Sequence, residues 1–452
     1  MLIFIENTPR AYAWGSSEAL AEMLGRAPSG APEAELWLGD HPGSPANVAK
    51  AAGTSLTLID LIASDPERYG VRGGPLPFLT KLLAIGAPLS LQVHPNREQA
   101  EAGFAAEEAA GIPRDAANRN YRDPNHKPEL LVALTEVRAL SGFRPLTAVG
   151  ADLSTLITIA TDHAAQLTAS AASSTSAASA TETELREGIA LLEVFHEHLT
   201  RTTRSDADFR AKLLEDMQHD PRVTLAIAAV RAATEADDGN ALEGALEPGR
   251  AQVLRELLQA YPTDPGVLVS LLLHLLVLEP GQAIFLRAGQ LHAYLSGVGV
   301  EVMAASDNVL RAGLTAKHVD IAELCRIVDT DDLADPHLPG IALAPGVTVW
   351  RPEVDDFQLF RARLCPVPEA WDDPPAEPAP HAIECPASEI EISAEYPLVL
   401  VVTDGRVRVD RPDGEISEVA NVRRGQSLYV SAGEPIRLTG SGEAFLATVG
   451  GA

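Results

Sequence analysis

The spacing of apolar residues changes twice along this chain of 452 residues, and the change limits what the chain can fold into. Up to residue 146, short apolar runs such as ELWLG and PLSLQVHP are separated by Gly and Pro, which is typical of short strands joined by tight turns. From 147 to 262, runs such as LREGIALLEVFHEHL have helical spacing. Strand-like runs return at 263 and continue to the end. The pattern therefore predicts a β-rich protein with a helical segment inserted in it.

This pattern predicts a mainly β fold with three domains. The predicted boundaries are 1–146 with 263–335 for the first β-domain, 147–262 for the helical insertion and 336–452 for a second, C-terminal β-barrel or jelly roll. We expect decorating helices at Leu56–Ile62 and Gln99–Gly111. The apolar stretch Val267–Leu278 is shorter than the roughly 20 residues of a bilayer span, so it predicts a buried core helix.

Two stretches of biased composition predict exposed loops. TASAASSTSAASATET, at 168–183, has almost no large apolar side chain, so we expect a mobile surface loop that can be shortened without loss of function. PEAWDDPPAEPAPHA, at 368–382, is rich in Pro, Asp and Glu and also predicts an exposed loop.

Charge and cysteine content exclude several functions. The chain has 63 acidic and 35 basic residues, a net charge of -28 and no basic run, so nucleic acid is not an expected partner. Cys325, Cys365 and Cys385 show no CxxC spacing, which indicates reduced thiols. The start shows no signal peptide, and no run suits a bilayer. We therefore expect a cytoplasmic protein without a membrane partner.

The segment PLSLQVHPN alternates apolar and polar residues, which places Ser90, Gln92 and His94 on one face of a strand. The simpler interpretation is a half-exposed strand whose polar face meets water. Pro95 favours another interpretation, because it ends the strand directly after His94 and leaves the imidazole at the rim of a barrel.

Two further segments place polar side chains at strand spacing. Lys127 and Glu129 share a face in HKPELLVAL, and His292 and Tyr294 follow a glycine turn in RAGQLHAYL. Taken alone, each is more often a surface or structural residue. Taken together, they suggest a four-ligand set for a divalent cation, in which imidazole and carboxylate suit zinc. The set is Gln92, His94, Glu129 and His292.

Four ordered segments carry a resemblance to a known family: YAWGS, PFLTKLLAIGAPLSLQVHPN, YRDPNHKPEL and AGQLHAYLSGVGVEVMAASDNVLRAGLTAKHVD. They resemble the type I mannose-6-phosphate isomerases, which are zinc-dependent cupin enzymes. The resemblance covers both parts of the first β-domain and the insertion. The tail from about Pro336 shares the family's pattern of short strands and turns but has no matching motif. It implies cupin or jelly-roll barrels, including a cupin-like C-terminal domain.

The resemblance also implies roles for individual residues. Gln92, His94, Glu129 and His292 would bind one zinc ion per chain. Lys81 and Ser90 would suit the substrate phosphate, and Lys127 and Arg311 the reacting end. The full set placed around the sugar phosphate is Trp14, Lys81, Ser90, Lys127, Tyr294, Glu301, Asp307 and Arg311.

The implied reaction is the reversible aldose–ketose isomerisation of mannose 6-phosphate and fructose 6-phosphate through a cis-enediol. Zinc would stabilise charge on the C1 and C2 oxygens, and Arg311 would stabilise the enediolate. The base stays open among Lys127, a zinc-bound water, Glu301 and Asp307. Nucleotide-sugar (GDP-mannose) synthesis and mannose catabolism are both open as uses of the product.

Two other classes of function agree less well with these residues. A non-catalytic sugar- or metal-binding cupin has no need for Lys127 and Arg311 beside a zinc site. An iron oxygenase would use two histidines and one carboxylate, and the glutamine argues against it. The expected partner is a small sugar phosphate, and we expect a monomer, with an oligomer as the open alternative.

Overall fold

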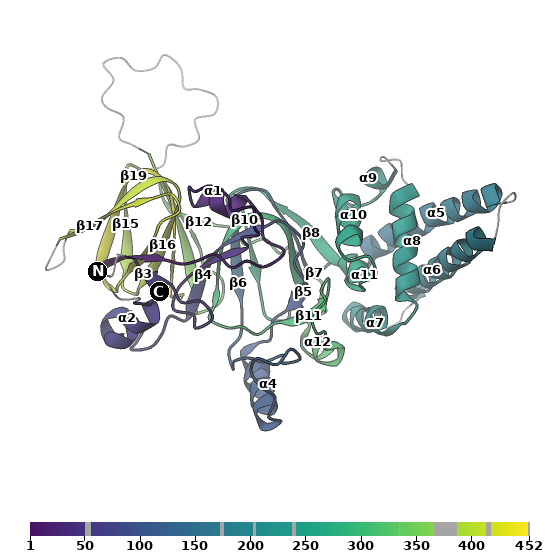
Figure 1. Cartoon of the computed structure of the whole chain (residues 1–452), viewed down its shortest axis with the longest axis horizontal. Helices are drawn as coiled ribbons and strands as arrows, with labels where there is room; N and C mark the ends of the chain where they lie inside the picture. Colours follow the sequence, from purple (N-terminus) through teal and green to yellow (C-terminus); the bar gives the residue numbers. More distant parts are fainter. Residues whose placement is uncertain are drawn as a thin grey trace, which may run out of the picture.

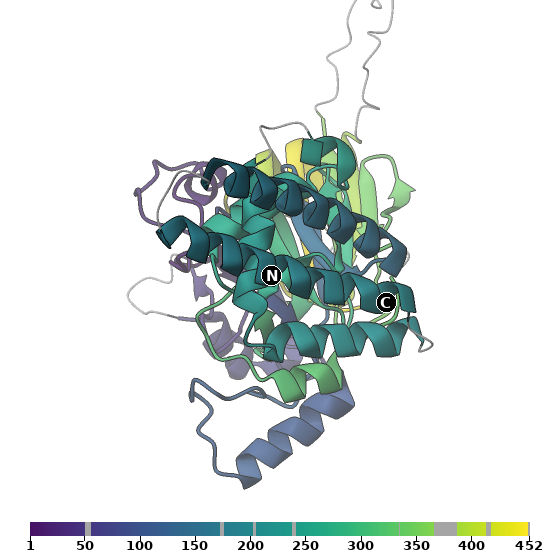
Figure 2. The same cartoon turned by 90° about the vertical axis from the view of Figure 1, so that its right-hand side faces the viewer.

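The computed structural model describes residues 1–49, 56–171, 176–201, 205–236, 241–333, 335–365, 387–412 and 417–450. Along the longest axis, the C-terminal strands, a central sheet and a group of helices follow one another (Figure 1). Figure 2 looks onto the helical end, where α5 and α6 run across the front of the molecule. The described part of the chain is thus sheet-rich with helices, as the pattern of apolar residues predicts.

The first sheet joins the two ends of the chain. Its strands run in the order β12-β13-β14-β19-β16-β18-β1-β3, with β15 beside β19 and β17 beside β16. Since β1 and β3 come from the N-terminal region, this sheet does not follow the predicted domain boundary at 336. The strands are β1 (Leu2–Glu6), β3 (Asn47–Val48), β12 (Ile341–Ala344), β13 (Val347–Trp350), β14 (Gln358–Leu364), β15 (Glu389–Ala394), β16 (Leu398–Arg411), β17 (Glu418–Arg423), β18 (Ser427–Val430) and β19 (Gly433–Thr448).

The second sheet contains the polar strand motifs. Its longest strand, β10, pairs antiparallel with β4, β5, β6 and β7, so it brings together segments that are distant in sequence. The strands are β2 (Glu35–Leu38), β4 (Phe78–Ile85), β5 (Leu91–Val93), β6 (Glu129–Ala133), β7 (Val137–Phe143), β8 (Leu273–Leu278), β9 (Ala283–Leu286), β10 (His292–Ala304) and β11 (Leu310–Gly313).

A β-bulge in β10 changes which residues face the interior of this sheet. Register with β7 shifts between Tyr294 and Ser296, and Gly297 follows with a φ of 112°, which favours glycine. An unbroken alternation from His292 would place Glu301 on the opposite face. After the bulge, Glu301 pairs with Leu131, which packs in the same apolar cluster as Tyr294. The bulge therefore puts Glu301 on the face of His292.

The helices divide into a group of six and a set of short connecting helices. α4 begins with a capping box in which Asn96 and Gln99 bond to each other's backbone, so the chain turns into a helix directly after His94 and Pro95. The group is α5 (Leu146–Ala171), α6 (Ser176–Arg201), α7 (Asp206–His219), α8 (Val223–Ala236), α9 (Ala241–Ala245) and α10 (Arg250–Ala260). The others are α1 (Ala19–Met23), α2 (Leu58–Ser64), α3 (Pro66–Tyr69), α4 (Arg97–Ala109), α11 (Gly266–Ser270) and α12 (Ile321–Ile327).

Several local predictions can be compared with these elements. The two decorating helices are confirmed as α2 and α4. The single core helix predicted at Val267–Leu278 is wrong, because α11 ends at Ser270 and the rest forms strand β8 against β7. A short apolar run has no period that separates strand from helix, and pairing with β7 decides it.

The tract at 168–183 also differs from its prediction as a loop. α5 continues to Ala171 and α6 begins at Ser176, while 172–175 lie outside the described residues. Alanine has the highest helix propensity, so the same composition that lacks apolar bulk extends two helices. The loop predicted at 368–382 lies outside the described residues. No helix among the described residues combines the length and apolarity needed to cross a bilayer.

A buried ion network holds the helical group onto the second sheet. On α5, the Asp152 carboxylate pairs with Arg144 and lies 3.8 Å from the Arg250 guanidinium. Arg144 Nε also donates to the Leu271 carbonyl at 2.8 Å, beside β8. All three charged side chains are buried. Glu247 also pairs with both arginines, but its side chain is 33% exposed, so Asp152 is the buried carboxylate that the two buried cations share.

We therefore expect Asp152→Ala to lower the free energy of unfolding by about 3–5 kcal/mol, the usual cost of breaking a buried ion pair. Urea denaturation followed by far-UV circular dichroism measures this change. Asp162→Ala is the matched control, since Asp162 is exposed on the same helix. Equal stability of the two variants would show that the network contributes nothing.

Candidate metal centre

Three buried side chains from three strands or strand ends converge in the second sheet. His94 follows β5, Glu129 begins β6 and His292 begins β10. His94 Nε2 lies 3.4 Å from Glu129 Oε1, and His292 Nε2 lies 3.6 Å from Glu129 Oε2. One ligand atom from each residue falls within 4.8 Å of the others. The spacing suits a single cation held between two imidazoles and a carboxylate.

Backbone carbonyls fix the orientation of both imidazoles. His94 Nδ1 lies 2.8 Å from the Asn308 carbonyl oxygen, and His292 Nδ1 lies 2.9 Å from that of Gln290. A carbonyl only accepts, so each ring carries its proton on Nδ1 and turns the Nε2 lone pair toward Glu129. Both Nε2 atoms are buried and have no hydrogen-bond partner in the described chain. A metal ion would satisfy both.

The protonation states agree with metal ligation. Burial and the nearby Lys127 ammonium lower the pKa of His94 to about 4, so its imidazole is neutral at pH 7. Burial alone would raise the pKa of Glu129, but Lys127 and His94 hold it well below its ordinary value. Lys127 Nζ lies 2.7 Å from Glu129 Oε1. Neutral imidazoles and an ionised carboxylate are the forms that bind divalent zinc.

Strand register brings Gln92 and Arg311 to the same place. Gln92 on β5 is the direct cross-strand partner of His292 on β10 and of Arg311 on β11. Directly opposed residues of antiparallel strands project from the same face. Gln92 therefore lies beside the histidines and can supply a fourth, neutral ligand, and Arg311 lies next to it.

A second group of charges borders the cluster at Glu301. Lys81 Nζ lies 3.1 Å from Glu301 and 4.0 Å from Glu35, and all three side chains are buried. Burial alone would lower the pKa of Lys81, but these carboxylates raise it above its ordinary value. Burial raises the pKa of Glu301 despite the opposing effect of Lys81. Two carboxylates already neutralise the Lys81 ammonium. Lys81 is therefore less suited to bind the substrate phosphate than the resemblance implies.

The remaining predicted residues lie at the edge of this region. Tyr294 is buried, and Trp14 packs against the apolar cluster that contains it. Ser90 is partly buried beside β5. Asp307 lies further out, since its side chain is 43% exposed and its carboxylate is 3.7 Å from His41.

Three cations near the cluster include two that the sequence analysis did not select. Arg311 is half-buried, whereas Arg122 and Lys317 are exposed, and none of the three forms an ion pair in the described residues. Burial and Arg122 lower the pKa of Arg311, and burial, Arg311 and Arg122 lower that of Lys317. Glu35 was also missed. No spacing in the sequence links these residues, which only the fold brings together.

The buried imidazoles and carboxylate, the bordering ionisable pairs and the cations define a metal-dependent enzyme built on a β-sheet. Comparison with known proteins gives the family. Residues 2–146 match the family model for the catalytic domain of type I phosphomannose isomerase. The mannose-6-phosphate isomerase of Escherichia coli K12 is 43% identical over 324 residues, 70% of this chain and 72% of the relative. The chain therefore belongs to the type I phosphomannose isomerase family.

More distant relatives match over nearly the whole chain. The mannose-6-phosphate isomerase of Bos taurus is 30% identical across 94% of this chain and 92% of its own. The crystal structure of the enzyme from Salmonella typhimurium bound to fructose 6-phosphate and zinc superposes with a TM-score of 0.76 at 30% identity, covering 99% of both chains. The superposition includes the C-terminal strands, where the sequence motifs were weakest.

Proposed function

We propose that the chain interconverts mannose 6-phosphate and fructose 6-phosphate at a zinc site formed by Gln92, His94, Glu129 and His292. The observation that carries the proposal is the pair of buried histidine Nε2 atoms that face Glu129 without hydrogen-bond partners. In a related enzyme, zinc and fructose 6-phosphate are bound together. When bound, zinc would stabilise negative charge on the reacting oxygens of the sugar.

We propose that proton transfer between C1 and C2 is carried out by Glu301. The carboxylate is buried and its pKa is raised, which brings it closer to the operating pH of a general base. Lys81 holds the carboxylate in place at 3.1 Å. Lys127 is engaged by Glu129 and Asp307 is more exposed, so both are less suited to this role. Arg311, beside Gln92, would stabilise the enediolate.

The substrate phosphate is best accommodated by Arg122 and Lys317. Both are exposed, near Arg311 and without a carboxylate partner in the described residues. They offer positive charge where the net charge of -28 would otherwise repel an anion. This assignment replaces Lys81 as the phosphate ligand and leaves Ser90 as a neighbouring hydrogen-bond donor.

For the architecture, we propose cupin-type jelly-roll barrels, with the second sheet as the catalytic domain and α5–α10 as the helical insertion. The C-terminal domain at 336–452 would include β1 and β3, since both pair within its sheet. We propose that the chain acts as a monomer.

Metal removal tests this function directly. We expect the purified protein to hold about one zinc per chain and to lose isomerase activity on chelation, since the reacting oxygens lose their cation. Metal analysis and a mannose 6-phosphate assay on the same samples measure both quantities. Restored zinc should restore the rate, with magnesium as the control. A rate that survives complete zinc removal would contradict the metal assignment.

Solvent exchange tests the proposed proton transfer. Substrate turned over in heavy water should acquire deuterium at the carbon that receives the proton, because a carboxylate base exchanges its proton with solvent. In some turnovers the base should return the original proton before it exchanges with solvent. Mass spectrometry of the recovered sugar phosphate measures the incorporation. If no deuterium enters after many turnovers, a hydride shift explains the reaction better than an enediol.

A further inference from the structure

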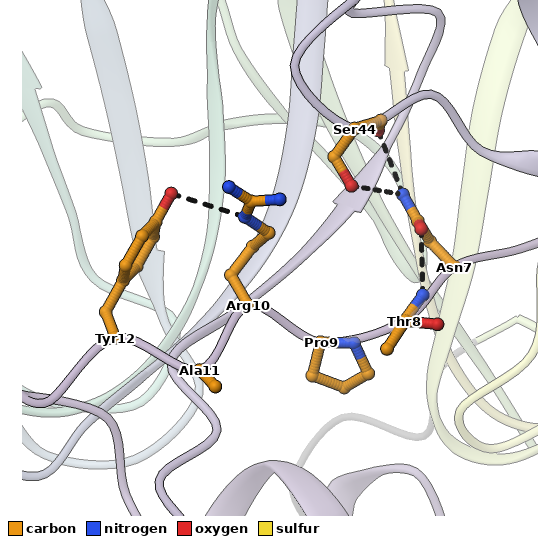
Figure 3. Close-up of a pocket in the computed structure, with 7 residues that line it drawn as sticks. All are labelled: Asn7, Thr8, Pro9, Arg10, Ala11, Tyr12 and Ser44. Atoms are coloured by element: carbon orange, nitrogen blue, oxygen red, sulfur yellow. Dashed lines mark hydrogen bonds between the residues drawn. The ribbon is translucent and has the colours of Figure 1, made fainter.

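A separate pocket lies beside the N-terminal segment, next to Trp37. It has a volume of about 350 Å³ and is lined by residues 7–12 and Ser44 (Figure 3). Polar groups dominate the lining, with an amide, three hydroxyls and the Arg10 guanidinium. None of these residues belongs to the proposed zinc or substrate site.

The pocket wall is fixed by hydrogen bonds before any ligand binds. Asn7 Nδ2 donates to the Ser44 carbonyl at 2.9 Å and to the Trp37 carbonyl at 3.0 Å. Arg10 N donates to the Glu35 carbonyl at 2.7 Å, and Ala34 N donates to the Arg10 carbonyl at 2.8 Å. These bonds anchor the segment to strand β2, so a ligand would meet a pre-organised surface.

The Arg10 guanidinium is held in place by aromatic rings and not by an acid. Its central carbon lies 5.5 Å from the Tyr12 ring and 5.6 Å from the Trp37 ring, and Nε donates to the Tyr12 hydroxyl at 3.3 Å. Figure 3 shows both terminal nitrogens without a bond to the other pocket residues. They form the planar fork that matches two oxygens of a phosphate.

The absence of an acidic partner is notable in a chain with 63 acidic residues. Other arginines with exposed side chains have such a partner, as Arg26 has in Glu33 and Arg97 in Asp356. Arg10 is partly buried and forms no ion pair in the described residues. A partly desolvated cation without a carboxylate favours an anionic ligand from outside the chain.

We propose that this pocket is a second anion site, which binds the phosphate group of inorganic phosphate or of a small phosphate monoester. Arg10 would contact two phosphate oxygens, and the hydroxyls of Thr8, Tyr12 and Ser44 would donate to the others. Trp37 lies close to both sites, since the Arg10 central carbon is 5.6 Å and Lys81 Nζ is 5.2 Å from its indole ring. A ligand at Arg10 would therefore change the environment of Trp37.

Equilibrium dialysis of the zinc-loaded enzyme at low ionic strength tests the proposal, with inorganic phosphate and glycerol 3-phosphate as separate probes. We expect about two bound phosphate groups per chain, one of them dependent on Arg10. Arg10→Gln should weaken that site about tenfold or more, because the charged fork is lost. Arg10→Lys keeps the charge and should give an intermediate affinity. Arg26→Gln, which removes the same charge from a paired arginine, should bind as the wild type does.

The other site should depend on Lys317, so the two proposals fail separately. If Lys317→Ala abolishes one site and Arg10→Gln leaves both affinities unchanged, the second anion site is overturned. If Arg10→Gln removes a site and Lys317→Ala removes none, the Arg10 site stands and the assignment of the substrate phosphate fails. The probe that binds more tightly to the Arg10 site identifies whether free phosphate or a monoester is the preferred ligand.

Discussion

Replacing His292 by alanine should remove zinc and isomerase activity together. Loss of the imidazole leaves Glu129 and His94 as the only charged or aromatic ligands, with Gln92 as a weak neutral one. Loss of a group that only supports a ligand typically costs 10–100-fold in affinity, so loss of the ligand itself should cost at least about 100-fold. Zinc content after dialysis and the rate on mannose 6-phosphate should fall in parallel.

His274→Ala is the matched control for this variant. His274 lies on β8 of the same sheet, and its Nε2 is engaged by the Leu333 carbonyl at 2.7 Å, so it has no role as a ligand. We expect this variant to keep its zinc and most of its rate. Full zinc occupancy in His292→Ala, with the control behaving normally, would mean that the ligand set is wrong.

The sequence predicted the proposed ligands because they follow simple strand rules. Gln92 lies on the short strand β5, and His94 follows two residues later at its end. Pro95 and the helix cap Asn96 come directly after. Local spacing is sufficient for such pairs, since neighbours two apart share a face. The cross-strand pairing of Gln92 with His292 required the family resemblance or the fold, because no local rule sets the register of strands far apart in sequence.

Other features could not be predicted from local spacing. The bulge at Ser296 moves Glu301 to the face of His292, and alternation alone places it on the opposite one. The apolar run Val267–Leu278 has no period that separates helix from strand. Its second part becomes strand β8 because it pairs with β7. Arg122 comes near Arg311 because its backbone bonds to Asn308 just before β11, and Lys317 because it follows β11, so nothing in their own segments marks them as cations of the proposed phosphate site.

Arg311→Ala should lower the turnover rate strongly while zinc stays bound. Arg311 lies opposite Gln92 and is half-buried, so in the role proposed for it its charge would act on the reacting end with little screening. Charge develops on the sugar oxygens only as the enediolate forms, and groups that stabilise such charge typically contribute about 10²–10³-fold to the rate. Most of the loss should therefore appear in kcat, and less in KM.

The distinction between a ligand and a charge-stabilising residue makes this variant decisive. Arg311→Lys keeps the charge but loses the planar fork, so its rate should lie between those of the wild type and Arg311→Ala. Arg114→Ala removes one positive charge from the exposed surface of the same acidic chain and should have a near-normal rate, which controls for the change in net charge. If Arg311→Ala also loses zinc, the arginine supports the metal site; if it keeps a near-normal rate, enediolate stabilisation must come from Lys127 or from the metal alone.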